Sequence, residues 1–418
     1  MLIVTLLNKI ERFKSFVYGK CQIMTIGSEE ALVIDIKERA NSKPKCPECE
    51  ISMQPHDRQP SRLFQYVPIW GAFKAYFRYA PRRGECPTHG VRVEMLPWAF
   101  GKERMTYSYQ SYLARWAKRL SWKETAEIFG TSWDSVFRAV SFAVDYGLAN
   151  RCLEGITEIG IDEIAVFFGQ KYLTMVYQLN EGARRLLWCG KDRKTKTLLR
   201  FFRQFGKELS AKLEFVSCDM WAPYLKVIAR KAPNALNILD RFHIMKKFNE
   251  AIDEIRRDEV KLFKANHQEN VLEKGRWLLL KRPENLSDKQ AVRLGDLLKL
   301  NISSVKAYLM REDFQRFWEY KRINFAERFL EDWVTRTLRT NLEPMKKVAN
   351  MLRSHKALIL NWFKAKGRIS CGAVEGLNLK AKLTMRKAYG FKSLECLQIA
   401  LYHTLGNLPE PLCNHRFS

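Results

Sequence analysis

The chain has 418 residues, of which 46% are hydrophobic and 12% aromatic, so it can bury a large core and is not a disordered chain. It carries 72 Lys and Arg residues against 45 Asp and Glu residues, a formal net charge of +27. Because this excess is spread along the whole chain, it favours a polyanion as the first partner, with a basic enzyme of another kind as the alternative. No stretch approaches the roughly 20 apolar residues that cross a membrane.

Two features favour a cytoplasmic location. The first 16 residues, MLIVTLLNKIERFKSF, contain a short apolar stretch that Asn8 and Lys9 interrupt, and they lack the basic leader and cleavage site of a signal peptide. Three of the ten cysteines belong to one cluster and the others are scattered singly. This usage is typical of a reducing compartment rather than of a disulfide framework.

The N-terminal part combines short strands with a cysteine and histidine cluster. Residues 22–38 alternate apolar and polar side chains around Gly27, which predicts a β-hairpin. Further on, two C-x2-[CH] hooks, CPEC and CPTH, each offer two metal ligands from one tight turn, and together they complete the tetrahedron that Zn²⁺ prefers. The sequence therefore predicts a structural zinc site with four ligands: Cys46, Cys49, Cys86 and His89. His56 is an alternative fourth ligand without the hook spacing, and chance surface cysteines are the ordinary alternative.

The next part of the chain is predicted to be helical, with a break at Gly130. In SWKETAEIFGTSWDSVFRAV, Ser121 and Glu124 are spaced as a capping box, and Thr131 or Ser132 caps the following helix. Four apolar residues are expected to pack the two helices together: Ala126, Ile128, Val136 and Phe137.

This pair of helices is the pattern of a helix-turn-helix, whose second helix reads DNA. Five residues are expected on or beside its exposed, DNA-facing side: Ser132, Trp133, Asp134, Ser135 and Arg138. The alternative is an ordinary helical hairpin, since such turns are common.

From residue 156 the pattern becomes rich in strands. Residues 156–239 predict three strands, a helix, a strand, a helix and a strand. This is the order of a ribonuclease-H-like sheet, an α/β architecture whose first and fourth strands are neighbours. Residues 241–365 are predicted to be almost wholly helical. A buried stripe on the first of these helices is expected from five apolar residues: Phe242, Met245, Phe248, Ile252 and Ile255.

Three carboxylates occupy separate places in this pattern. Asp162 lies within the first strand, Asp219 follows the fourth, and Glu375 is expected on a helix after the helical region. Close carboxylates repel one another unless a cation is bound, and two Mg²⁺ ions about 3.5–4 Å apart would neutralise them and assist phosphodiester chemistry. Asp162, Asp219 and Glu375 are therefore the predicted catalytic residues and Mg²⁺ ligands, with Mn²⁺ as the alternative ion.

Each acid also has an ordinary alternative: a surface position for Asp162, a helix cap for Asp219 and a solvated helix charge for Glu375. Asp240, which follows the last strand, competes with Asp219 as the second ligand. His243 is either an auxiliary contact near the metal or substrate, or simply a residue at the start of a helix.

Glu375 is the single acid of residues 371–392, which contain five bases: Lys380, Lys382, Arg386, Lys387 and Lys392. The helical face of Glu375 is expected to include three further residues: Asn378, Leu379 and Lys382. We expect the bases to bind the phosphate backbone of a DNA strand that crosses the metal ions.

The chain resembles the DDE insertion-sequence transposases of the ISL-three family over nearly its whole length. The resemblance rests on the two hooks and on motifs in the family's order: VRVEMLPWA, SWKETAEIFG, GIDEIAV, SCDMWAPY, LDRFHIMKKFNEAIDEIRR, LLLKRPENL, VEGLNLKAK and RKAYGF. It implies a ribonuclease-H-like core with an all-helical insertion and Asp162, Asp219 and Glu375 as the DDE triad. It also implies an N-terminal zinc and helix module that recognises the element's inverted repeats, and contact of Tyr389, in the closing motif, with the cleaved strand.

We therefore expect five segments: a strand and zinc-binding domain (1–100), a helix-turn-helix DNA-binding domain (101–150), the first part of the core (155–240), the helical insertion (241–365) and the last part of the core (366–418). The predicted function is a nucleoid-associated bacterial transposase that binds inverted repeats and target DNA as a dimer or larger assembly, with Mg²⁺-dependent cleavage and strand transfer. The alternatives are a catalytically idle DNA-binding protein that uses residues 40–150 alone and a structure-selective nuclease without strand transfer.

Overall fold

The computed structural model of the chain describes residues 3–69, 73–167, 171–365, 371–388 and 390–411. Two compact units divide it: Met1–Cys152 with Ala381–Ser418 form the first, and Leu153–Lys380 form the second. The prediction assigned residues 366–418 to the catalytic core, whereas this division places the part from Ala381 onward in the first unit. The reason is that the last helix of the chain packs on a helix of that unit.

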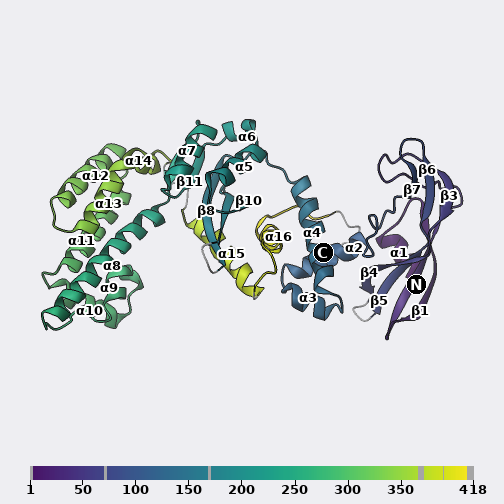
Figure 1. Cartoon of the computed structure of the whole chain (residues 1–418), viewed down its shortest axis with the longest axis horizontal. Helices are drawn as coiled ribbons and strands as arrows, with labels where there is room; N and C mark the ends of the chain where they lie inside the picture. The colour runs from purple at the N-terminus through teal and green to yellow at the C-terminus, as the bar shows by residue number, and fades with distance from the viewer. Residues whose placement is uncertain (1–2, 70–72, 168–170, 366–370, 389, 412–418) are drawn as a thin grey trace. The chain divides into compact units, whose positions relative to one another are not determined.

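A four-stranded sheet with the order β1-β2-β5-β4 begins the first unit. Helix α1 precedes it, and the bounds of these elements are α1 Ile3–Ile10, β1 Phe16–Ile26, β2 Glu29–Glu38, β4 Arg62–Ile69 and β5 Phe73–Tyr79 (Figure 1). β1 and β2 form the predicted antiparallel hairpin, and Gly27 makes its turn with a φ of +68° that glycine adopts without strain. Trp98 is fully buried against the rings of Phe16 and Tyr79, so aromatic packing holds this core together.

A three-stranded antiparallel sheet, β3-β6-β7, follows within the same unit. Its strands are β3 Gln54–Arg58, β6 Arg82–Cys86 and β7 Gly90–Val93. A buried ion pair joins Arg82 to Glu94 at 2.7 Å, and the Tyr79 hydroxyl donates to Glu94 at 2.6 Å. Because Tyr79 belongs to β5, this buried network links the two sheets.

The predicted helix pair is present, with one further helix before it: α2 Tyr107–Ala117, α3 Trp122–Ile128 and α4 Trp133–Asn150. The capping box is confirmed, because the side chains of Ser121 and Glu124 each accept a hydrogen bond from the other's backbone N–H. Gly130 turns the chain at a φ of +54°, and Ser132 caps α4.

The predicted packing of α3 on α4 is right for three residues and wrong for Ile128. Ala126 and Val136 are buried, and the partly buried Phe137 packs on the same cluster. The side chain of Ile128 is 62% exposed. It is two positions after Ala126, which turns it about 200° round the helix and away from α4.

The second unit contains a five-stranded sheet with the order β10-β9-β8-β11-β12. Its strands are β8 Glu158–Phe167, β9 Lys171–Gln178, β10 Arg185–Lys191, β11 Phe215–Cys218 and β12 Leu236–Leu239. β8, β9 and β10 pair antiparallel, whereas β11 is parallel to both β8 and β12. The first strand of this sheet therefore lies beside the fourth, as predicted.

Helices α5 Thr195–Phe205 and α7 Ala222–Lys231 cover one face of this sheet, with the short α6 Lys207–Ala211 between them. Ile159 and Ile161 of β8 point into the apolar cluster that these helices form with the sheet. Side chains alternate along a strand, so Gly160 and Asp162 face the opposite side.

The predicted helical region consists of seven α-helices among the described residues: α8 Arg241–Ala265, α9 Arg276–Leu280, α10 Asp288–Leu298, α11 Ser303–Gln315, α12 Ile323–Leu338, α13 Glu343–Ser354 and α14 Lys356–Lys364. The stripe expected on α8 is wrong at Phe242, whose side chain is 51% exposed, whereas Ile244 is buried. Ile244, Phe248, Ile252 and Ile255 lie at four- and three-residue steps along one face, and Phe242 is off that face.

Two helices end the described chain, α15 Cys371–Lys387 and α16 Leu394–Leu405, both coloured yellow in Figure 1. α16 packs on α4 in the first unit. Tyr389 of the closing motif lies outside the described residues.

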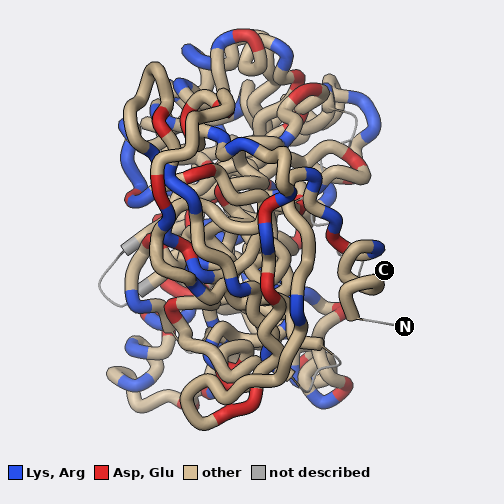
Figure 2. Tube along the Cα trace, turned by 90° about the vertical axis from the view of Figure 1, so that its right-hand side faces the viewer, with Lys and Arg blue, Asp and Glu red and all other residues tan. Residues whose placement is uncertain are grey.

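Basic residues occur throughout the traced chain and are not confined to one terminus, as the blue positions in Figure 2 show. The described helices include none that is both long enough and apolar enough to cross a membrane.

Candidate functional site

Three aspartates lie side by side at the end of the parallel part of the second unit's sheet. Ser217 of β11 pairs with Gly160 of β8, so continuing the register by two residues places Asp219 beside Asp162. Cys218 pairs with Leu239 of β12, so one further residue places Asp219 beside Asp240 as well. Neighbouring strands are about 4.8 Å apart, so Asp219 has Asp162 on one side of it along the sheet and Asp240 on the other.

Asp162 is held by two donors from different elements. The backbone N–H of Glu163 donates to its Oδ1 at 2.8 Å, and the side-chain amide of Asn378 on α15 donates to its Oδ2 at 2.5 Å. The Nε2 atom of His243 lies 3.7 Å from Oδ1. The side chain of Asp162 is 15% exposed, so it reaches solvent while its orientation is held.

Asp219 is engaged by an arginine that the sequence reading did not single out. Arg193, in the loop before α5, donates to Asp219 Oδ2 at 2.7 Å, and its Nε lies 3.1 Å from Glu163 Oε1. Its guanidinium also lies over the ring of Trp221, 4.8 Å from the centroid. The other oxygen of Asp219 accepts from the Trp221 backbone N–H at 3.0 Å. Arg193 therefore supplies positive charge within the acidic cluster.

Glu163 is an acid of this cluster whose surroundings disfavour its ionised form. Burial, with the nearby charge of Asp219, raises the pKa of Glu163 to about 7, although Arg193 acts in the opposite direction. This residue follows Asp162 directly and was not predicted as a site residue. The signal available in the sequence was its place beside Asp162 in the strand GIDEIAV.

Asp240 and His243 sit at the start of α8. Asp240 caps this helix by accepting from the Phe242 backbone N–H at 2.8 Å, which is an ordinary helix-cap role. His243 lies 3.9 Å from Asp240 and also contacts Asp162, and the hydrogen bond to Asp162 raises the pKa of His243 in spite of its burial. His243 is thus a contact between two of the three aspartates.

Glu375 lies on α15, one turn before Asn378, and its side chain is exposed. Among the described residues no hydrogen bond or ion pair joins it to Asp162 or Asp219. The residues at four-, seven- and eleven-residue steps from it, Leu379, Lys382 and Arg386, are exposed as well. The predicted face is therefore correct for Leu379 and Lys382 but wrong for Asn378, which is buried against the sheet.

The donor set of this cluster fits a hard divalent cation. Mg²⁺ prefers oxygen ligands and is commonly bound by one or two carboxylates. Asp162 and Asp219 offer such oxygens on adjacent strands, and their side chains are 15% and 12% exposed, which leaves access from outside. Carboxylate oxygens carry spare lone pairs, so the existing hydrogen bonds do not prevent coordination.

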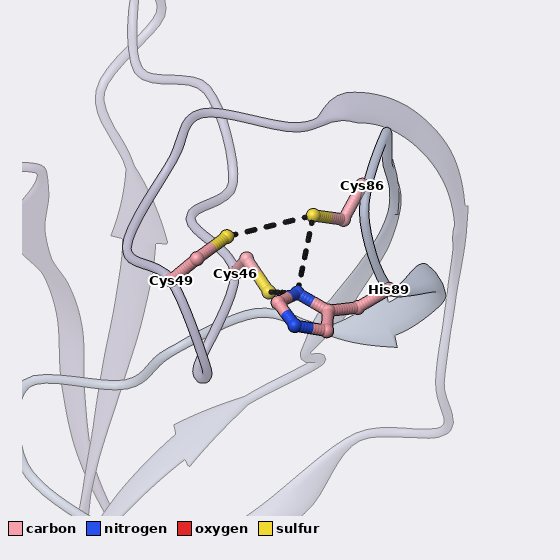
Figure 3. Close-up of side chains that lie close together, drawn as sticks. All are labelled: Cys46, Cys49, Cys86 and His89. Carbon is pink, nitrogen blue, oxygen red and sulfur yellow. Dashed lines mark hydrogen bonds between the residues drawn. The ribbon is translucent and has the colours of Figure 1, made fainter.

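The two cysteine hooks meet in the first unit, as Figure 3 shows. The distances from Cys46 Sγ to His89 Nδ1, from Cys86 Sγ to His89 Nδ1 and from Cys49 Sγ to Cys86 Sγ are each 3.6 Å. A tetrahedral Zn²⁺ requires about 3.8 Å between two sulfurs and about 3.6 Å between sulfur and nitrogen. Within the described part of the chain, no other group of three or more such side chains brings its ligand atoms within 4.8 Å of one another.

The local backbone explains why the hooks converge. Cys86 ends β6, and Gly90 begins β7 with a φ of +68°, so the second hook is the turn of a hairpin. Glu48 accepts from Arg92 at 2.8 Å and lies 3.4 Å from His89 Nε2, which leaves Nδ1 facing the sulfurs. His56 lies on β3 outside this group, 3.6 Å from Asp57, so His89 is the fourth member.

The residues predicted to read DNA begin α4 and are held by local contacts. The Ser132 hydroxyl accepts from the Ser135 backbone N–H at 3.1 Å. Trp133 stacks on Phe137 with ring centroids 5.6 Å apart. Arg138 is exposed and forms an ion pair with Glu103 at 3.1 Å.

The C-terminal bases reach the same region of the first unit. The Lys392 amine lies 4.0 Å from the ring centroid of Trp133, and the Lys387 amine donates to the Lys118 carbonyl at 3.4 Å. A cavity of about 890 Å³ lies between α3, the end of α15 and α16, and four bases line it: Lys118, Lys123, Arg386 and Lys387. Sequence reasoning placed these C-terminal bases at the catalytic carboxylates and missed their proximity to the helix pair.

A family model described as "Transposase", that of the ISL-three DDE family, matches residues 159–401. The transposase for insertion sequence element IS1001 of Bordetella parapertussis is 25% identical over 353 residues, which are 84% of this chain and 86% of that protein. The transposase for insertion sequence element IS1557 of Mycobacterium tuberculosis (strain ATCC 25618 / H37Rv) is 26% identical over 408 residues, which are 92% of this chain and 90% of that protein.

Proposed function

This chain belongs to the ISL-three family of DDE transposases, and from that premise we propose that it binds the inverted repeats of its own insertion sequence, cuts there and joins the ends to target DNA. One observation carries the proposal: Asp162 lies beside Asp219 on the adjacent strand and is hydrogen-bonded to α15, the helix of Glu375. These three acids are the proposed catalytic triad.

The proposed core is ribonuclease-H-like. Three antiparallel strands followed by two parallel ones support this assignment. The first and fourth strands, β8 and β11, are adjacent, which supports it as well. In this proposal residues 155–240 begin the core, residues 241–365 are an insertion, and α15 returns to the sheet with Glu375.

Asp162, Asp219 and Glu375 would hold the divalent ions, with Asp240 as a further oxygen ligand close by. Mg²⁺ bound at such carboxylates activates an attacking oxygen and stabilises the leaving oxygen of a phosphodiester. Arg193 offsets the negative charge of the cluster and keeps Asp219 oriented. Water first breaks one phosphodiester and leaves a 3′-hydroxyl. That hydroxyl then attacks a phosphodiester of the target, so one bond forms as another breaks and no bond to the protein is required.

The first unit is the proposed DNA-recognition part. α3 and α4 form a helix-turn-helix, with Ser132, Trp133, Ser135 and Arg138 directed to the DNA. The bases lining the neighbouring cavity support phosphate binding there, so we assign Arg386, Lys387 and Lys392 to DNA held at this helix pair. Lys380 and Lys382, nearer to Glu375 on α15, are assigned to the strand that is cut.

A structural zinc ion is proposed at Cys46, Cys49, Cys86 and His89. All four positions are protein ligands, so the site is closed to substrate, and its role is to hold the hooks together. A dimer or larger assembly is proposed because two ends of an element must be paired before ordered cutting.

The decisive experiment compares Asp162→Asn with the unaltered protein on labelled DNA that carries the element's ends. We expect the variant to lose Mg²⁺-dependent cleavage by at least about a thousandfold, a loss of roughly 4 kcal/mol in transition-state stabilisation, while binding the same DNA equally well. Asp296→Asn is the matched control, because Asp296 is an exposed helical residue of the insertion and should not affect cleavage.

Cleavage by Asp162→Asn at the normal rate would show that the assignment of the catalytic triad is wrong. Binding without cleavage by the unaltered protein would favour the catalytically idle DNA-binding protein. Cleavage without joining of the labelled end to a plasmid would favour a nuclease.

A further inference from the structure

We propose that Asn378 is a positioning residue that holds α15, the helix of Glu375, on the strand of Asp162 through the hydrogen-bonded chain Tyr177–Asn378–Asp162. The inference deepens the proposed function and rests on it. It assigns to Asn378 and Tyr177 a role in holding the carboxylates before a cation binds, with no contact to the reacting atoms.

The first observation is the burial of Asn378 on an otherwise apolar surface. In the second unit, α15 buries three apolar side chains with it: Ala373, Val374 and Leu377. Asn378 is 8% exposed. A buried carboxamide is destabilising unless it is hydrogen-bonded, so packing alone does not explain an asparagine here.

The second observation is that both polar atoms of the Asn378 amide are hydrogen-bonded, and that these bonds allow only one orientation of the amide. The Tyr177 hydroxyl donates to Asn378 Oδ1 at 2.7 Å, and Asn378 Nδ2 donates to Asp162 Oδ2 at 2.5 Å. An ionised carboxylate only accepts hydrogen bonds, so the amide nitrogen must face Asp162 and the amide oxygen must face Tyr177. Tyr177 is fully buried, which holds this orientation in place.

The third observation is a second close contact that fixes the direction of α15. A Cβ on Gly160 would lie 2.6 Å from Val374 Cγ2, so the helix touches the strand backbone there. Four residues of helix, from Val374 to Asn378, rise about 6 Å. Two residues of strand, from Gly160 to Asp162, rise about 6.6 Å. The spacing of the two contact points on the helix therefore matches their spacing on the strand, and together the two contacts hold α15 along β8.

These contacts determine both the orientation of the Asp162 carboxylate and the position of Glu375 on its helix. Asp162 is oriented by Asn378 and by the Glu163 backbone N–H, one donor for each oxygen. Glu375 is three residues before Asn378, so its place on the helix surface follows from the position of that amide. Partners that orient metal ligands usually change metal affinity 10–100-fold when they are removed.

The test is direct binding of Mn²⁺ to the full chain, measured by the loss of the free-ion electron paramagnetic resonance signal after one equivalent of Zn²⁺ per chain has filled the cysteine and histidine site. We expect Asn378→Ala to weaken Mn²⁺ binding about 10–100-fold. We expect Tyr177→Phe, which keeps the ring and removes only the donor, to weaken it roughly threefold to tenfold.

Asn361→Ala is the matched control. Asn361 is an equally buried helical asparagine, 8% exposed, and donates to the Asn237 carbonyl at 2.8 Å in the same unit. Its replacement should destabilise the chain to a similar extent, measured by urea unfolding, and leave Mn²⁺ binding unchanged.

The inference is overturned by either of two results. One is Mn²⁺ affinity within twofold of the unaltered chain for both Asn378→Ala and Tyr177→Phe. The other is an equal loss of affinity in Asn361→Ala, which would show a general effect of destabilisation. The proposed function is tested separately by Asp162→Asn, which should abolish Mn²⁺ binding at this site. If that variant binds and cleaves normally, the triad is wrong, whatever Asn378 does.

Discussion

Gly160 is a position at which α15 packs directly on the backbone of β8, and replacing it with alanine tests how that helix docks. The new Cβ would lie 2.6 Å from Val374 Cγ2 and 3.0 Å from Leu179 Cδ1. Both are shorter than normal contacts, so α15 must move outward or these side chains must leave their positions. Overpacking of this kind destabilises by about 1–3 kcal/mol.

The same structure predicts a rescue. Val374→Ala removes two methyl groups from a buried site and should by itself lower the free energy of unfolding by about 1.6 kcal/mol. In the double variant the space left by the valine accepts the new methyl group. We therefore expect a favourable coupling of roughly 1–2 kcal/mol between the two sites, whereas independent sites would give additive losses.

The assay is urea unfolding of the full chain together with Mg²⁺-dependent cleavage of DNA. Gly160→Ala should reduce cleavage, because it displaces Glu375 relative to Asp162, and the double variant should recover part of it. Gly376→Ala is the control: apart from the backbone of its own helix and its two chain neighbours, no heavy atom of the described residues lies within 4 Å of its Cβ position. Alanine in a helix should stabilise by about 1 kcal/mol without loss of cleavage. Additive losses in the double variant would refute the direct contact of α15 with β8 as the cause.

Three further outcomes follow from the first unit. Cys49→Ser should abolish binding of Zn²⁺, measured by metal analysis of the purified protein, whereas Cys152→Ser, at an exposed cysteine outside the cluster, should retain one ion per chain; full occupancy in Cys49→Ser would contradict the site. Burial and the nearby charge of Lys118 lower the pKa of His403 to about 3. Folded His403 therefore stays neutral between pH 6.5 and 3 while the unfolded chain gains a proton, so stability falls as pH falls, by about 2 kcal/mol between pH 7.5 and 5. Urea unfolding of His403→Phe should lack this loss, and an unchanged pH dependence would exclude His403 as its source. Lys387→Ala should reduce the salt dependence of DNA binding by about one unit of log K per log salt, measured by fluorescence anisotropy. Lys226→Ala in the second unit should leave the slope unchanged, and equal slopes for all three proteins would remove Lys387 from the DNA contacts.

Local patterns in the sequence determine much of this protein. Ser121 and Glu124 cap α3 because both hydrogen bonds form within one turn of chain, and Gly27 closes a hairpin because only its two flanking strands are involved. The hooks at Cys46 and Cys86 are likewise recognisable from spacing, since each is one tight turn. Such features depend on neighbours in sequence, and the helices and strands that they delimit were predictable for the same reason.

Tertiary structure decided which faces of those elements are buried and which charges meet. Helical spacing allowed Asn378 to face solvent with Glu375, but docking on β8 turned its amide to Asp162 and Tyr177. Arg193 contacts Asp219 and Glu163 because the loop before α5 lies at the strand ends. No residue spacing in the sequence predicts this contact. The periodicity of a helix shows which residues share a face, but not which element covers that face. The energy of a buried contact depends on residues far apart in the chain. The sequence by itself therefore determined the elements and the candidate acids, whereas the fold determined how those acids are oriented and what holds them.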